Sequence, residues 1–171
     1  MQNQSAQSPA EYATLPAGTI VKWGMPADAL SSLKPLASCT GVGAMGTQGG
    51  FVDCTTLADT QKQYISDLPD GADKTLTFLD NPEDQNLADF LNAAEKRQTV
   101  QFYVELPNKR TSTSIIALAG WQMAEIAAPA NTAIKIEVKG KQNAITWGTV
   151  AASGGSMPTQ PENNAETTHS S

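Results

Sequence analysis

Hydrophobic and polar residues alternate along several short stretches of the chain, which is the pattern of half-buried β-strands. The clearest alternation covers residues 99–106, where Val100, Phe102, Val104 and Leu106 would share one face. The other stretches that predict strands are residues 19–23, 51–57, 74–79, 112–127, 133–139 and 144–150. The pattern therefore predicts a fold built mostly of strands.

Turn residues separate some of these strands. Residues 107–110, Pro-Asn-Lys-Arg, predict a hairpin connection, and residues 140–143, Gly-Lys-Gln-Asn, predict a turn before the last strand. Gly120 predicts a bend inside the long stretch 112–127. In the strand 133–139, the alternation places three side chains on the inner face: Ile134, Ile136 and Val138.

One stretch follows a helical period instead. Its apolar residues recur at the spacing of a single helix face: Leu87, Phe90, Leu91 and Ala94. Asn81 is expected to cap this helix, with Pro82 in the first turn and Glu83 and Asp84 at the positive end of the dipole. The basic residues 96–97 suit its last turn. One amphipathic helix flanking a mostly antiparallel sheet is the predicted fold class.

Three segments lack such patterns. Residues 1–13 and 151–171 are poor in branched aliphatic residues, so they predict a flexible N-terminal arm and a disordered C-terminal tail. Residues 38–50 contain five glycines, and a mobile loop is expected over residues 36–50. The folded domain is expected to cover residues 14–150.

Composition narrows the classes of function. The 171 residues include 11 basic and 17 acidic ones, for a net charge of −6. This balance argues against a basic nucleic-acid reader, because phosphate neutralisation needs clustered Lys and Arg. The longest uncharged apolar stretch, residues 115–120, is too short to cross a bilayer, so no membrane partner is expected.

Charge is divided along the chain. Residues 53–95 contain ten acidic and two basic residues, whereas residues 96–150 contain seven basic and three acidic ones. Two interpretations stay open. Either solvated faces happen to segregate by sign, or an acidic and a basic surface serve head-to-tail contacts between copies of the chain.

Candidate chemistry is sparse. The one histidine, His169, lies two residues from the end, which removes the usual basis of Ser-His and multi-histidine metal sites. Cys39 and Cys54 are expected to be free thiols, with a disulfide as the alternative. Residues 41–46 match G-x-G-x-x-G, but the following Thr-Gln-Gly-Gly disfavours the helix that a dinucleotide site needs, so a flexible loop is preferred.

The remaining polar and aromatic groups also have structural explanations. Asp80, together with Glu83 and Asp84, is explained by helix capping rather than by acid–base or metal chemistry. The acids at 67, 70 and 73 suit turns, with a calcium site as the weaker alternative. Three tryptophans are expected to pack in the core or an interface, although they could form a platform for sugar or single-stranded nucleic acid: Trp23, Trp121 and Trp147. No cofactor, metal or catalytic residue is predicted.

Several segments in order resemble a known family. They are Thr-Thr-Leu-Ala-Asp-Thr running into Leu-Pro-Asp-Gly (55–71), Thr-Leu-Thr-Phe (75–78), the helix 81–97, Val-Gln-Phe-Tyr-Val-Glu-Leu-Pro (100–107), Gly-Trp (120–121) and the strand pair 133–147. This arrangement, over residues 14–150, is similar to that of the tail tube, or major tail, proteins of long flexible-tailed, lambda-like siphovirus bacteriophages.

The resemblance implies a β-sandwich or barrel with one flanking helix, related to type VI secretion tube proteins. It implies a virion protein, made in the host cytoplasm, whose hexameric rings stack into the conduit for DNA ejection. The implied partners are copies of itself, the tail initiator and distal tail proteins, the tape measure and terminator proteins, and DNA that passes without specific binding. The loop would reach the neighbouring ring through Ser38, Gly41, Val42, Gly43, Met45, Gly46, Gly49 and Phe51.

A different class stays open on the residues alone. A monomeric β-sandwich could bind a carbohydrate or another protein, with one of the three tryptophans as its platform. Monomers at all concentrations together with retention on a glycan would favour such a module. Monomers alone would not exclude a tube protein, because a tube protein can require an initiator before it polymerises.

Overall fold

A computed structural model describes residue 10 and residues 13–127 and 132–150. The predicted N-terminal arm, apart from residues 10 and 13, and the predicted C-terminal tail lie outside the described residues. The elements are β1 (Ile20–Gly24), η1 (Leu30–Ser32), β2 (Lys34–Pro35), β3 (Cys39–Gly41), β4 (Thr47–Gln48), β5 (Phe51–Asp53), β6 (Tyr64–Ser66), β7 (Asp70–Gly71), β8 (Asp73–Leu79), α2 (Gln85–Glu95), β9 (Thr99–Glu105), β10 (Arg110–Met123) and β11 (Lys135–Thr149).

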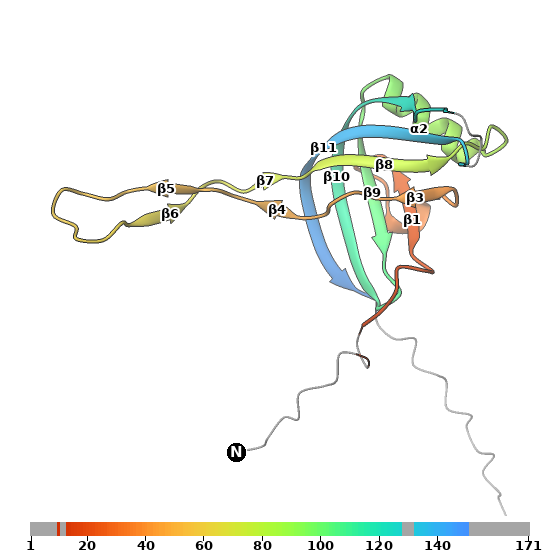
Figure 1. Ribbon diagram of the computed structural model, residues 1–171. Coiled ribbons are helices and arrows are strands. Elements are labelled where there is room, and N and C mark those ends of the chain that lie inside the picture. Colours follow the sequence, from red (N-terminus) through yellow and green to blue (C-terminus); the bar gives the residue numbers. More distant parts are fainter. Residues whose placement is uncertain (1–9, 11–12, 128–131, 151–171) are drawn as a thin grey trace, which may run out of the picture.

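Seven strands form one antiparallel sheet in the order β2-β1-β9-β10-β11-β8-β3. The sheet curls strongly, and α2 packs against it (Figure 1). Alternate residues of β8 and β9 point inward and are fully buried, as the alternation predicts: Leu76, Phe78, Val100, Phe102 and Val104. The fold is therefore mostly β with a flanking helix, as the sequence indicates.

Phe90 on α2 is the centre of the core. Its ring lies 5.2 Å from that of Trp23, 5.5 Å from that of Phe78 and 6.2 Å from that of Phe102. Three of the four residues of the predicted helix face are buried, and Leu91 packs against the core while partly exposed. Ala93 is an additional buried residue of this helix.

The predicted cap of this helix is wrong by three residues. Asp84 is the N-cap, and its carboxylate accepts hydrogen bonds from the backbone N–H groups of Asn86 and Leu87. Asn81 instead accepts a bond from the backbone of Glu83 in the turn before the helix. The Asn-Pro pair mimics a helix start, but the chain first makes this separate turn, in which Asp84 donates its N–H to the Asn81 carbonyl.

The predicted turn at residues 140–143 is also wrong, because β11 runs through it without interruption. Extra length is absorbed by a bulge, since Ile115 pairs with Ala144 and Ile116 with Gln142. Gly140 serves close packing rather than a turn, because a Cβ there would lie 2.8 Å from the carbonyl oxygen of Ala117. The predicted hairpin at 107–110 does connect β9 to β10.

Two smaller expectations concern the same strands. Ile134 precedes β11 and is 49% exposed, so only Ile136 and Val138 of the predicted inner row are buried. The bend expected at Gly120 is a second bulge, where the register with β11 shifts and Gly120 has a φ of 131°.

The glycine-rich segment is more regular than the expected loop over 36–50. Residues 39–41 form β3, which pairs with β8 at the edge of the sheet, and residues 47–48 form β4. The partners of β3 and β4 are β8 and β7, which lie much later in the sequence, so the local composition does not indicate this pairing. Beyond β3 the segment leads into a long two-stranded ribbon that leaves the body on the side away from α2 (Figure 1).

Candidate functional site

The ribbon comprises residues 46–72 and is called the arm from this point on. It is a different segment from the predicted N-terminal arm, residues 1–13. At the base of the ribbon β4 pairs with β7, and further out β5 pairs with β6, both antiparallel. Every residue from 47 to 70 is exposed. The arm is therefore held by its own strand pairing and by its attachment at the base, without packing on the body (Figure 1).

Apolar side chains occur on both faces of the arm. Residues paired across two strands share a face, so Val52 and Ile65 lie on one face and Phe51 and Tyr64 on the other. Phe51 and Tyr64 line a shallow hollow of about 250 Å³. Six large apolar side chains of the arm are exposed: Phe51, Val52, Leu57, Tyr64, Ile65 and Leu68. A solvated ribbon has no reason to carry them, so this surface has the composition of an interface.

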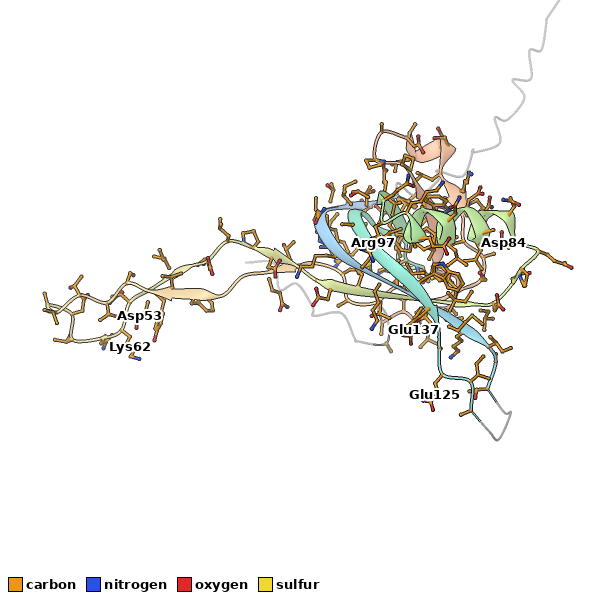
Figure 2. The ribbon with its side chains drawn as sticks, turned by 90° about the horizontal axis from the view of Figure 1, so that it is seen from above. Asp53, Lys62, Asp84, Arg97, Glu125 and Glu137 are labelled. Atoms are coloured by element: carbon orange, nitrogen blue, oxygen red, sulfur yellow. The ribbon has the colours of Figure 1, made fainter. Side chains whose placement is uncertain are left out.

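Aspartates shape the outer part of the arm. The Asp53 carboxylate accepts hydrogen bonds from the backbone N–H and the hydroxyl of Thr55, and the Asp59 carboxylate does the same with Thr56. These bonds lower the pKa of both carboxyls. Asp53 and Lys62 lie well away from the body (Figure 2). The Thr-Thr-Leu-Ala-Asp-Thr stretch therefore provides turn chemistry that orders the outer end of the arm.

The structure divides the predicted loop residues into three places. Ser38 and Gly41 belong to the body, where the Ser38 carbonyl accepts a bond from Leu79 and Gly41 ends β3. Two others, Val42 and Met45, pack against the core while partly buried. The remaining four mark the base or the arm itself: Gly43, Gly46, Gly49 and Phe51.

The sequence did not predict the apolar residues after Phe51 as part of an interaction surface. Leu57, Tyr64, Ile65 and Leu68 lie among threonines and aspartates that indicate turns, and their short strand segments show little alternation. A usable signal was present, because large apolar residues in an otherwise polar and acidic stretch indicate a surface that another molecule covers.

Comparison with known families identifies the chain. The model of the phage tail tube protein family matches residues 14–150. The chain belongs to this family. The resemblance drawn from the sequence is thereby confirmed, and the tail tube protein is a structural protein of the phage tail. No curated protein matches the sequence.

Solved structures share the fold at low identity. The PVC sheath–tube complex of an extracellular contractile injection system aligns with a TM-score of 0.64 at 13% identity, over 85% of this chain and 100% of that one. The tail of an empty gene transfer agent particle aligns with a TM-score of 0.58 at 12% identity, over 81% and 100%. The SPP1 tail tube aligns with a TM-score of 0.58 at 8% identity, over 78% of each chain.

Two of the three aspartates considered for calcium, Asp70 and Asp73, form ion pairs at the base of the arm. The third, Asp67, accepts a hydrogen bond from the backbone N–H of Leu68. The Lys141 ammonium of the tail tube protein lies 3.0 Å from the Asp70 carboxylate and 3.1 Å from that of Asp73. The hydrogen bonds that the ammonium donates to these two carboxylates raise the pKa of Lys141. Within residues 13–127 and 132–150, no cluster of three or more His, Cys, Asp or Glu side chains could hold a metal ion.

The three tryptophans do not form a common platform. Trp23 is 5% exposed and donates from Nε1 to the Asn86 carbonyl, so it packs in the core as predicted. Trp121 and Trp147 are partly exposed on β10 and β11. Because Trp121 pairs with Val138 and Trp147 with Ser112, they lie near opposite ends of the strand pair.

The structure also shows where the two cysteines and the G-x-G-x-x-G stretch lie. Cys39 and Cys54 are free thiols, and burial raises the pKa of Cys39 to about 11. The G-x-G-x-x-G stretch leads from β3 to β4 rather than to a helix. In the part of the chain that the structure describes, no helix has the length and apolar character needed to cross a membrane.

The long strands leave a free sheet edge. β8 pairs with β11 only over residues 135–141, whereas β10 pairs with β11 as far as Thr149. Among the described residues, the stretch 144–149 of β11 therefore has no strand partner on its other side. By contrast, the two terminal strands of the sheet are short, since β2 has two residues and β3 has three. The free part of β11 is the longer template for pairing with another chain.

Proposed function

We propose that the tail tube protein assembles into hexameric rings that stack head to tail, and that the stack is the conduit through which DNA leaves the virion. The arm would join copies of the chain, reaching from one ring to the next. The observation that carries this proposal is the exposure of large apolar side chains on both faces of the arm. A ribbon of this kind can bury both faces only by inserting between surfaces of other molecules.

Contacts within a ring would use the free edge of β11. Pairing of residues 144–149 with a strand of the next copy would remove an edge that favours uncontrolled aggregation. A head-to-tail contact that closes by rotation generates a ring. The sheet edge and the arm are different surfaces, so they provide separate contacts within and between rings.

Charge supports a contact between unlike surfaces. The arm has four acidic residues and Lys62, whereas residues 96–150 of the body have seven basic and three acidic ones. Copies of the same chain can therefore attract each other when the arm of one meets the body of another. Such attraction weakens in salt, because the Debye length falls from about 10 Å at 0.1 M to about 3 Å at 1 M.

The proposed role is mechanical, without catalysis or a cofactor. The stacked rings would interact at their ends with the tail initiator and distal tail proteins and with a terminator, and would enclose the tape measure protein before DNA passes. Among structures with this fold, one is described as a sheath/tube terminator and another as a tube-terminating cap. Proteins with this fold in other assemblies therefore support the proposal of such partners.

Sedimentation velocity tests the proposal. The parent chain, concentrated alone or seeded with a tail initiator, is expected to form species of six copies and larger stacks. A variant whose arm is shortened, with residues 51–66 replaced by Asn-Gly, should retain the ring-sized species but lose the stacks. A parent chain that stays monomeric under both conditions would contradict the proposal.

A further inference from the structure

Gln142 is a buried amide at the base of the arm. Its side chain is on β11 and is 1% exposed. Its Nε2 donates a hydrogen bond of 2.7 Å to the Gly46 carbonyl, and its Oε1 accepts a longer one, of 3.5 Å, from the Gly46 N–H. Its backbone N–H donates to the Ala72 carbonyl at 3.1 Å. One residue therefore binds both the outgoing and the returning strand of the arm.

The geometry around Gln142 leaves little freedom. Gly71 lies so close that a Cβ would be 1.7 Å from the Gln142 carbonyl oxygen. Gly46 has a φ of 129°, a conformation that residues with side chains rarely adopt. The β11 bulge lies directly after Gln142, between its pairing with Ile116 and the next pairing, at Ala144. Both strands of the arm thus pass Gln142 in a single arrangement.

A second buried polar side chain holds the segment that leads into the arm. Lys74 on β8 is 2% exposed, and its ammonium donates to the Val42 carbonyl at 3.2 Å. Gly43 has a φ of 63°, and a Cβ there would lie 3.1 Å from the Thr75 carbonyl oxygen. Lys74 and Gln142 therefore fix backbone groups four residues apart in the same segment.

Burying these two side chains costs free energy that an apolar residue would not cost. A buried amide or ammonium is stabilised only by the bonds it makes. The side-chain hydrogen bonds of Gln142 and Lys74 described above go to backbone groups of residues 42 and 46, and none joins two strands of the main sheet. Their effect is to set the position of the arm.

We infer that Gln142 is a positioning residue that fixes the angle at which the arm leaves the body, with Lys74 holding the segment before it. The inference rests on the proposed function, since the angle matters only if the arm must meet a second copy. At about 3.3 Å per residue, the eight residues from 47 to 54 extend about 26 Å. A tilt of about 10° then moves the far end by about 5 Å, which exceeds the contact distance of apolar side chains.

The test measures, in the monomer, the distance between a spin label on the arm and a second label on the body. Cys54, which is exposed near the outer end of the arm, takes one spin label, and an exposed helix position changed by Glu95→Cys takes the other. Cys39→Ala removes the competing thiol. Gln142→Met keeps the length of the side chain but removes both of its hydrogen bonds. Gln101→Met is the matched control, because Gln101 is a buried glutamine on β9 of the same sheet.

The distance distribution between the two labels is expected to be narrow in the parent and in Gln101→Met, and about twofold broader or shifted by about 5 Å in Gln142→Met. Gln142→Glu keeps an acceptor for the Gly46 N–H, but its ionised carboxylate cannot donate to the Gly46 carbonyl. The distance distribution of this variant should therefore broaden as well. Circular dichroism checks that each variant is folded. One folded Gln142 variant is sufficient to decide the test. An unchanged distribution in a folded Gln142 variant would overturn the inference.

Sedimentation of the same samples separates the two proposals. Loss of stacking in Gln142→Met with an intact arm surface supports the link between arm angle and assembly. Stacking at the parent level despite a broadened distribution would overturn that link. A parent chain that never assembles would count against the proposed function, whereas the label distances would still decide the role of Gln142.

Discussion

Val52 and Ile65 lie directly opposite each other across the two strands of the arm, and they are 45% and 58% exposed. A cross-strand apolar pair contributes about 0.2–1 kcal/mol, which is too little to maintain an isolated two-stranded ribbon in water. Phe51 and Tyr64, which are diagonal neighbours on the other face, cannot maintain the ribbon alone either. The arm therefore needs contacts with another molecule to stabilise it, because its own strand pairing is insufficient.

Removing the aromatic side chains of the arm should weaken assembly without unfolding the body. We expect the double variant Phe51→Ser and Tyr64→Ser to change the unfolding free energy by less than about 0.5 kcal/mol, because both side chains are exposed. If each is buried on stacking, the loss of about 1.5–3 kcal/mol per side chain raises the concentration needed for assembly at least about tenfold. Light scattering against concentration measures this change.

Leu30→Ser is the matched control for this variant. Leu30 is 52% exposed on η1, in the body. Its assembly curve should coincide with that of the parent. Equal curves for the arm variant and the control would show that the arm does not bind another copy.

Lys74 makes stability depend on pH. Burial lowers the pKa of its ammonium from 10.5 to about 8, so between these values the unfolded chain binds more protons than the folded one. The unfolding free energy should therefore rise from pH 8 towards pH 10. Urea titrations across this range should show the rise in the parent and its loss in Lys74→Met.

Cys39 acts in the opposite direction in part of this range. Its pKa is raised from 9.0 to about 11, so between these values the folded state retains more protons and stability falls as pH rises. Both proteins are therefore compared in a Cys39→Ala background. Parallel pH profiles for the parent and Lys74→Met would contradict the role assigned to the buried ammonium.

The two residues considered as helix caps give a direct comparison. Asp84→Ala removes the carboxylate that accepts from two backbone N–H groups and should cost about 1 kcal/mol. Asn81→Ala removes only the bond to Glu83 in an exposed turn and should cost less than about 0.5 kcal/mol. Thermal unfolding of the two variants checks the order, and a larger loss at Asn81 would restore the cap predicted from the sequence.

The core centred on α2 gives the largest expected effect. Phe90 is fully buried against three aromatic rings, so Phe90→Ala should cost about 3–5 kcal/mol. Leu91 is partly exposed, and Leu91→Ala should cost clearly less. Urea unfolding followed by circular dichroism measures both, and equal losses would contradict the central place of Phe90.

Local patterns predicted the elements whose structure depends on near neighbours. The alternation in β8 and β9 and the apolar face of α2 follow from burial of one side, which the sequence records directly. The resemblance between ordered segments indicated the tail tube fold. The predicted sandwich description is refined by the structure into one strongly curled sheet with α2 packed against it (Figure 1).

Two of the errors arise from pairing between residues far apart in the sequence, whereas the misplaced helix cap comes from a local turn. β3 pairs with β8 from nearly forty residues away, and β11 crosses a Gly-Lys-Gln-Asn stretch because β10 pairs with it on both sides of a bulge. Gln142 lies within that stretch, so its role at the arm base was hidden by residues that indicate a turn. The arm was only partly anticipated, since its glycines lie at the base and its apolar residues further out.

Cryo-electron microscopy of tubes grown from the purified protein, alone or from a tail initiator, tests the central claim most directly. The account predicts stacked rings in which the arm of each copy inserts against another copy and the side chains of Phe51 and Tyr64 are buried. Tubes in which the arms project freely into solvent would contradict it.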